Sequence, residues 1–280
     1  MRRLSVLAVV AATMLLGACG ESPGERVDGQ GVAPVHPSLE RARQVAAAWN
    51  GSKAAASWQA GYHPAGDWTR YPGGAENAGL TLRTPLPAPS PASARVKWPD
   101  GTSVSRPLQP AATAYDFLNR YAGYGPQLTV TSVKLGEMTL PTTRGPATVP
   151  AWLFTVDGYA TPVTRAAAVP SPLPPAPLPP RTGQWTASRL VTARGSSVTV
   201  IVPHGTCDAG AAVKALETPA SVVLTAYVRA PEPGPCRADL KMERVTVRLA
   251  AALGKRALLD ASTALPVPYD LPKGASPSWS

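Results

Sequence analysis

Alternating apolar and polar positions dominate the second half of the chain. Residues 244–249 read Arg-Val-Thr-Val-Arg-Leu, with every second side chain apolar, and residues 197–202 and 221–228 alternate in a similar way. Successive side chains of a β-strand point to opposite faces, so each run predicts a strand with one buried face. No long amphipathic helix interrupts them. We therefore expect residues 182–280 to form a small all-β domain, either a sandwich or an open sheet.

The first half mixes helical periodicity with strand patterns. Ser38 is a typical N-cap for a helix that ends near Trp49, and a second helix is expected from Thr113. Between them, Pro99-Asp100-Gly101 has turn chemistry and predicts a hairpin. Four β-rich runs follow between residues 128 and 169. The pattern predicts that residues 38–168 form an α+β domain with helices packed on an antiparallel sheet.

A proline-rich segment separates these two halves. Residues 169–181 contain seven prolines in thirteen positions. Proline at this density blocks helices and sheet ladders and favours extended polyproline II. The expected fold is therefore an N-terminal α+β domain (38–168), a Pro-rich linker (169–181) and a small all-β domain (182–280).

Composition narrows the class of protein. Of 280 residues, 44% are hydrophobic and only 16% are charged, against about a quarter in typical globular proteins. The low charge argues against a highly charged disordered chain or a long coiled coil. The 33 prolines and 24 glycines must then lie mainly in turns and linkers.

The N-terminus has the layout of an export signal. Arg2 and Arg3 precede an apolar stretch from Leu4 to Leu15, which is shorter than the roughly 20 apolar residues that span a bilayer. Leu16-Gly17-Ala18-Cys19 follows directly. We expect a signal peptide over residues 1–18 and a flexible Gly-, Pro- and Ser-rich tether over 19–37.

The Leu-Gly-Ala-Cys motif resembles a bacterial lipobox. With 20 Arg against 7 Lys, the chain resembles a secreted lipoprotein of a high-GC Gram-positive bacterium, an actinobacterium; residues 128–136 and 143–156 are similar to a pattern in uncharacterised secreted proteins of that group. The resemblance implies that Cys19 carries the lipid and holds the protein on the outer face of the cytoplasmic membrane. It implies no catalytic residues. The alternative is an ordinary cleavable signal peptide that ends at Cys19.

Two cysteines remain, both in the second half. Cys207 and Cys236 lie outside the membrane under this interpretation, where disulfides form readily, so we expect them to be bonded to each other. In the chain-entropy picture, such a bond stabilises the fold by roughly 3 to 4 kcal/mol. The alternative takes His204, Cys207 and Cys236 as metal ligands, but a fourth ligand is missing from the pattern. We expect neither a metal nor another cofactor.

Catalytic signatures are missing from the sequence. Of the three histidines, His63 is the best placed to act as a general base, but no nucleophile motif, metalloprotease motif or phosphate-binding loop accompanies it. We therefore expect a non-enzymatic binding or scaffolding module of the cell envelope. The alternatives are an envelope hydrolase that uses His63 or a carboxylate pair, and a solute-binding lipoprotein. An antiparallel sheet argues against the latter, whose members alternate strands and helices.

Two groups of residues are candidate binding surfaces. The first is aromatic and lies in a Gly- and Pro-rich stretch: Tyr62, Trp68 and Tyr71. The second is basic: Arg237, Lys241, Arg244 and Arg248. The net charge is +10. On an exported protein, a basic face meets anionic lipid headgroups or cell-wall polymers, although Arg can also serve simply as the solubilising residue of a GC-rich genome. The expected partners are the membrane through Cys19, and an anionic cell-wall polymer or another envelope protein, with no nucleic acid.

Overall fold

The computed structural model describes residues 39–88, 91–120, 122–123, 125–230 and 239–269. The described residues are mostly β, with 44% strand and 13% helix. Helices in the described ranges are α1 (Glu40–Trp49), α2 (Lys53–Ala60) and α3 (Ala111–Arg120). At 8 to 10 residues each, none of these described helices has the length and apolar character needed to cross a membrane.

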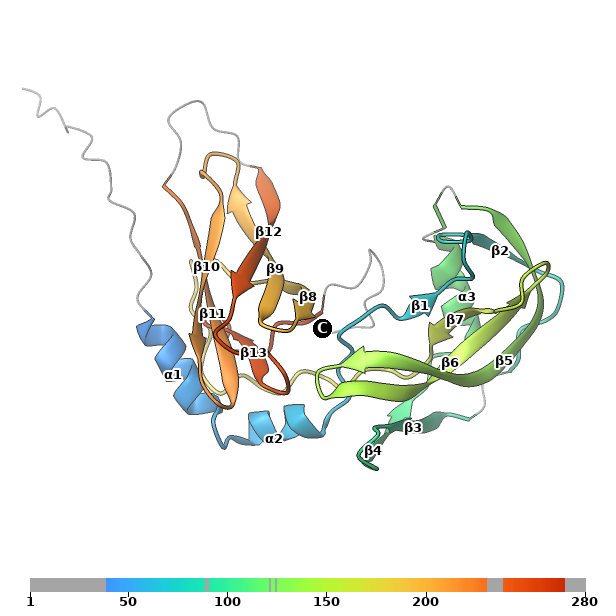
Figure 1. The fold of residues 1–280 in the computed structure, drawn as a ribbon, viewed down its shortest axis with the longest axis horizontal. Coiled ribbons are helices and arrows are strands. Elements are labelled where there is room, and N and C mark those ends of the chain that lie inside the picture. Colours follow the sequence, from blue (N-terminus) through green and yellow to red (C-terminus); the bar gives the residue numbers. More distant parts are fainter. Residues whose placement is uncertain (1–38, 89–90, 121, 124, 231–238, 270–280) are drawn as a thin grey trace, which may run out of the picture. The chain divides into compact units, whose positions relative to one another are not determined.

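A seven-stranded sheet occupies the first half (Figure 1). Its strands are β1 (Thr69–Arg70), β2 (Gly79–Leu82), β3 (Ser93–Lys97), β4 (Ser103–Pro107), β5 (Gln127–Thr142), β6 (Gly145–Val156) and β7 (Val163–Ala166). The long antiparallel β5–β6 hairpin is its centre, and the turn residue Gly145 has a φ of +108°. The predicted β3–β4 hairpin is confirmed, with Val96 opposite Val104.

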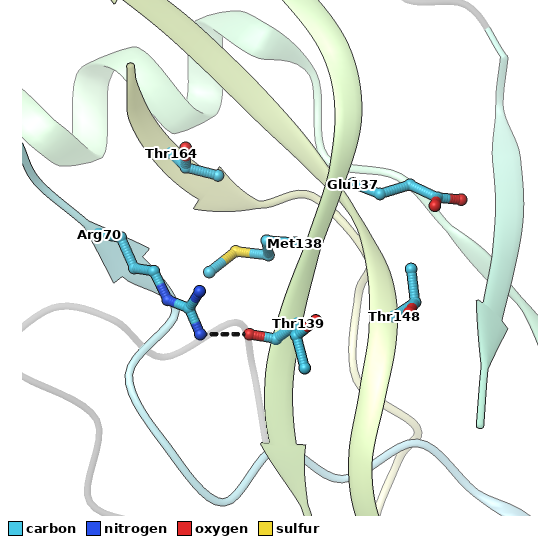
Figure 2. Close-up of a pocket in the computed structure, with 6 residues that line it drawn as sticks. All are labelled: Arg70, Glu137, Met138, Thr139, Thr148 and Thr164. Atoms are coloured by element: carbon cyan, nitrogen blue, oxygen red, sulfur yellow. Dashed lines mark hydrogen bonds between the residues drawn. The ribbon is translucent and has the colours of Figure 1, made fainter. Parts of the chain in front are cut away.

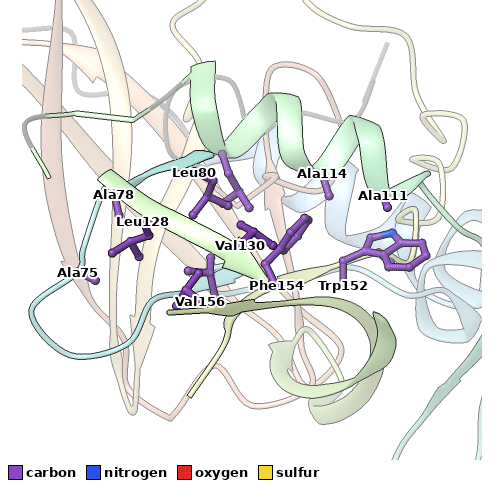
Figure 3. Packing of buried hydrophobic residues seen from close by; sticks show 13 residues of the cluster. Ala75, Ala78, Leu80, Ala111, Ala114, Leu128, Val130, Trp152, Phe154 and Val156 are labelled. Carbon is purple, nitrogen blue, oxygen red and sulfur yellow. The ribbon is translucent and has the colours of Figure 1, made fainter. Parts of the chain in front are cut away.

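Helix α3 covers part of this sheet (Figure 3). Ala111, Ala114 and Leu118 form its buried face. They belong to one core cluster with Val130 of β5 and Phe154 of β6. The second predicted helix is thus confirmed, and its apolar stripe packs into the core, as amphipathic periodicity requires.

Two three-stranded sheets form the second half. One contains β8 (Arg189–Arg194), β9 (Ser197–Gly205) and β12 (Leu240–Arg248); the other contains β10 (Ala211–Glu217), β11 (Ser221–Val228) and β13 (Ala257–Asp260). Val198 and Val200 of β9 share a buried cluster with Val222 and Leu224 of β11. The two sheets therefore pack face to face through their alternate residues.

Helices α1 and α2 pack on the other side of the β10–β11–β13 sheet. Val45 and Trp49 of α1 share a buried cluster with Val223 of β11 and Leu259 of β13. The Arg41 guanidinium fastens α1 further, because its Nε donates to the Ala261 carbonyl at 3.0 Å. The β10–β11–β13 sheet is thus buried on both faces.

The expected fold class is wrong. The chain is not an N-terminal domain of helices on a sheet followed by a separate small β domain. Two of the three described helices precede the first sheet in sequence but pack on strands of the second half. The physical reason lies in β11, where residues 221–224 are all buried, so both of its faces need a cover. Periodicity shows that α1 buries one face, but it cannot show against which sheet.

The Pro-rich segment 169–181 forms neither helix nor strand. Leu173, Ala176 and Leu178 pack against the cluster under α1 and α2. Ser171 exchanges hydrogen bonds with Tyr62, since its backbone N–H donates to the Tyr62 carbonyl at 2.8 Å and its hydroxyl accepts from the Tyr62 N–H at 2.9 Å. The segment therefore packs against the fold in these places. Its role as a domain linker stays a prediction.

Candidate functional site

The register of the β8–β9–β12 sheet gathers arginines on its outward face. On β9, residues with even numbers from Val198 to His204 are buried, so residues with odd numbers point outward. Antiparallel pairing places Arg244 opposite Ile201 and Arg248 opposite Ser197. Along the other edge of β9, strand β8 places Arg189 opposite Ile201 and Arg194 opposite Ser197. Paired residues share a face of the sheet, so all four arginines lie on the outward side.

The outward side chains form three rows across the sheet. We call these rows the arginine face: Arg189–Ile201–Arg244, Thr192–Thr199–Thr246 and Arg194–Ser197–Arg248. The Thr199 and Thr246 hydroxyls are hydrogen-bonded at 2.9 Å, which confirms that these rows share one side. Neighbouring rows are separated by about 7 Å, two strand residues, so the arginine rows lie about 13 Å apart.

The arginine face is positively charged and open to solvent. Its four arginines are exposed, and none of its nine positions is acidic. In the described part of the chain, the side chains of Arg194, Arg244 and Arg248 take part in no ion pair or hydrogen bond. Guanidinium groups in this state can bind phosphate or carboxylate groups with two parallel hydrogen bonds each.

Polar contacts on the inner side hold β12 in place. His204 Nε2 lies 3.4 Å from Glu243 Oε2, and its Nδ1 lies 2.8 Å from the Gly205 carbonyl oxygen. Glu243 also accepts a hydrogen bond from the Ala211 N–H at 2.6 Å, which links β12 to the start of β10. These contacts fix the register that sends Arg244 and Arg248 outward.

A shallow polar pocket lies on the seven-stranded sheet (Figure 2). Its volume is about 350 Å³, and its lining is Arg70, Glu137, Met138, Thr139, Thr148 and Thr164. Arg70 donates to the Thr139 carbonyl and Glu137 pairs with Lys97 at 2.9 Å, so both charges are already engaged. Among the lining residues, Glu137 is the one carboxylate. The pocket thus lacks the carboxylate pair that glycoside hydrolysis uses.

The predicted aromatic surface lies largely in the core. Tyr62 is 0% and Trp68 2% exposed, and both belong to a cluster that also contains Met138 and Leu140. Tyr71 is half-buried and packs against a second cluster beside it. Tyr62 and Trp68 therefore present no ring to solvent for a ligand to stack on.

His63 lies in an unsuitable place for a general base. It is 1% exposed, and its ring stacks on Trp58 with centroids 3.7 Å apart. Burial, with a smaller contribution from the Arg106 charge, lowers the pKa of His63 to about 3. A catalytic base works best with a pKa near the operating pH and must reach its substrate. These observations weigh against the hydrolase that uses His63.

The basic residues predicted from sequence divide between two sides of the sheet. Arg244 and Arg248 lie on the arginine face, whereas Lys241 pairs with the inward residue His204 and so belongs to the opposite side. Arg237 lies outside the described residues. Sequence reasoning missed Arg189 and Arg194, because an irregularity between Leu190 and Thr192 breaks the alternation of β8.

The state of Cys207 argues against the alternative in which His204, Cys207 and Cys236 bind a metal. Cys207 is disulfide-bonded, so its sulfur is not free to bind a metal beside His204. Cys236 and Cys19 lie outside the described residues. The pairing of Cys207 with Cys236 and the lipid on Cys19 stay predictions.

Comparison of the chain with protein-family models, curated proteins and solved structures finds no match.

The depressed pKa of His63 predicts a specific acid sensitivity. Between pH about 6.5 and about 3, the unfolded chain binds a proton on this residue and the folded chain does not, so stability falls as the pH falls. The slope is about 1.4 kcal/mol per pH unit. Urea unfolding between pH 6 and 4 should show this slope reduced in His63→Gln and unchanged in His36→Gln. Equal slopes in wild type and His63→Gln would contradict the assignment.

Proposed function

We propose that this protein is a lipid-anchored, extracytoplasmic envelope protein that acts as a non-enzymatic binding module. The arginine face is the surface that binds, and its ligands are anionic groups of the envelope. The main support for this proposal is the set of four exposed arginines in two rows, with no acidic side chain among them.

The chemistry of arginine supports an anionic ligand. A guanidinium keeps its charge at every physiological pH and matches the two oxygens of a phosphate or carboxylate. The sheet holds the four groups on one side, so an extended anionic surface or polymer can contact several at once. Threonine hydroxyls between the rows add neutral hydrogen-bonding groups.

Two carboxylates of the second half, Glu217 and Asp260, are used within the fold. Glu217 binds Arg256 at 2.9 Å and accepts from the Ala250 N–H at 2.6 Å. Asp260 is buried and accepts hydrogen bonds from the Ala187, Ser262 and Thr263 N–H groups. These carboxylates hold loops in place, which supports a binding role over the hydrolase alternative.

Loss of outward arginines should weaken binding to a simple polyanion. In an assay with immobilised polyphosphate, Arg244→Gln/Arg248→Gln should bind roughly tenfold more weakly, because two charges near the anion are lost. Added salt should weaken the wild type more steeply than the variant. Lys241→Gln is the matched control, since it removes an exposed charge on the opposite side of the same strand. An equal loss of polyphosphate affinity in Lys241→Gln and in Arg244→Gln/Arg248→Gln would show that the arginine face is not the binding surface.

The lipid anchor has its own test. Cys19→Ala removes the thiol that the lipobox resemblance assigns to lipid attachment, so the variant should move from the membrane fraction to the soluble fraction. Cell fractionation followed by immunoblotting measures the distribution, and Cys207→Ala serves as the cysteine control that should stay with the membrane. A Cys19→Ala protein that remains fully membrane-bound would show that the anchoring proposal is wrong.

A further inference from the structure

Two large apolar side chains on β12 are exposed. Leu240 is 67% and Met242 59% exposed, and these are the exposed large hydrophobic residues of the described chain. Both lie on the outward side of the β8–β9–β12 sheet, where Met242 pairs with Pro203 and Leu240 with Gly205. We call Pro203, Leu240 and Met242 the apolar end.

The apolar end continues the arginine face without a break. Met242 and Pro203 form the row that precedes Arg244 and Ile201, about 7 Å away along the strands. One side of the sheet therefore carries exposed apolar side chains at one end and four arginines over the rest. Apolar groups beside arginines match the boundary between acyl chains and headgroups in a bilayer.

We infer that this surface docks on an anionic phospholipid bilayer, with Leu240 and Met242 entering the acyl boundary and the arginines binding headgroup phosphates. The inference rests on the proposed function, because it names the anionic partner of the same face. No bond is made or broken, so the step is one of reversible binding.

The apolar end favours a bilayer over a dissolved anionic polymer. A chain of phosphate or carboxylate groups can bind arginines, but it offers nothing to Leu240 or Met242. A bilayer removes their surface from water, at roughly 25 cal/mol for each Å² of apolar area buried. The combination of both side-chain types on one face is therefore matched by lipid.

The proposed anchor keeps the surface near a membrane. Nineteen residues separate the proposed lipid on Cys19 from Leu39, the first described residue. A flexible chain of that length has a root-mean-square span of about 25 Å. The tether then holds the folded part near the bilayer, so even weak binding by the arginine face adds to the anchor.

A second copy of the chain fits this surface poorly. Strand β12 is at the edge of its sheet, where another strand could pair. Lys241, Arg244 and Arg248 outnumber the single acid Glu243 on this strand, so two copies would bring like charges together. An anionic surface is the complementary partner.

Vesicle sedimentation tests the inference with the chain from residue 19 onward, carrying Cys19→Ala to remove the lipid. Vesicles contain 30% phosphatidylglycerol in phosphatidylcholine, or phosphatidylcholine alone. The variants are Leu240→Ser/Met242→Ser, Arg244→Gln/Arg248→Gln and the control Lys241→Gln. All are exposed positions, and urea unfolding confirms that each variant is folded. Polyphosphate binding and sedimentation-equilibrium mass are measured on the same samples.

We expect the protein to bind anionic vesicles and not to bind neutral vesicles. Leu240→Ser/Met242→Ser should lose roughly tenfold in vesicle affinity while keeping its polyphosphate affinity, because only the bilayer contacts apolar groups. Arg244→Gln/Arg248→Gln should lose roughly tenfold or more on both probes. Lys241→Gln should lose at most a few-fold on either.

Four results would overturn the inference. Unchanged vesicle affinity in Leu240→Ser/Met242→Ser would show that the apolar end does not insert. Binding of polyphosphate without binding of vesicles would assign the face to a polymer and leave the proposed function standing. A wild-type dimer that Leu240→Ser/Met242→Ser converts to a monomer would assign the apolar end to a second copy. Failure to bind either probe would remove the proposed function as well.

Discussion

Burial of the β10–β11–β13 sheet on both of its faces determines the arrangement of the second half. Val222 and Leu224 of β11 point toward the β8–β9–β12 sheet, and Val223 points toward α1 and α2. A slip of one residue would exchange these faces, so the register is strongly fixed. The facing sheet must in turn present its valines inward. The arginines of β8 and β12 are on the outside because the valines of β9 and β12 are needed on the inside.

Buried polar groups reinforce this arrangement at the ends of strands. Burial raises the pKa of Asp260, although hydrogen bonds from Thr263, Ala187 and Ser262 act in the opposite direction. The Arg41 guanidinium reaches from α1 to the Ala261 and Pro179 carbonyls. Such groups are costly to leave unpaired, so they specify where α1 and the C-terminal loop sit. The arginine face has no corresponding internal partners for Arg194, Arg244 and Arg248 in the described structure, and these side chains are therefore free to bind an external anion.

Much of the strand content could be predicted from the sequence, but its assembly could not. The run at 221–228 matches the bounds of β11, but the expectation of one buried face is wrong there, because residues 221–224 are all buried. Residues 244–248 of the next run lie in β12, with Arg244 and Arg248 outward as expected. Helix α2 was missed because its Ala-rich sequence has a weak stripe, although Ser52 caps it through the Ala55 N–H. The Gly- and Pro-rich context of Tyr62 and Trp68 predicted a surface position for both, and this prediction was wrong. Their exposure depends on which sheet covers them, and the local sequence does not show that. Long-range pairing decides these points, and one sequence carries little signal for it.

We propose the outward face of β8, β9 and β12 as the binding surface. Hydrogen–deuterium exchange of the chain from residue 19 onward, with and without polyphosphate, tests it most directly because it reports every strand at once. Binding at this face predicts slower exchange in peptides that cover 189–205 and 240–248, with little change elsewhere. Protection confined to the peptides around Arg70, Glu137 and Thr148 would place binding at the polar pocket and show that the arginine face is not the binding surface.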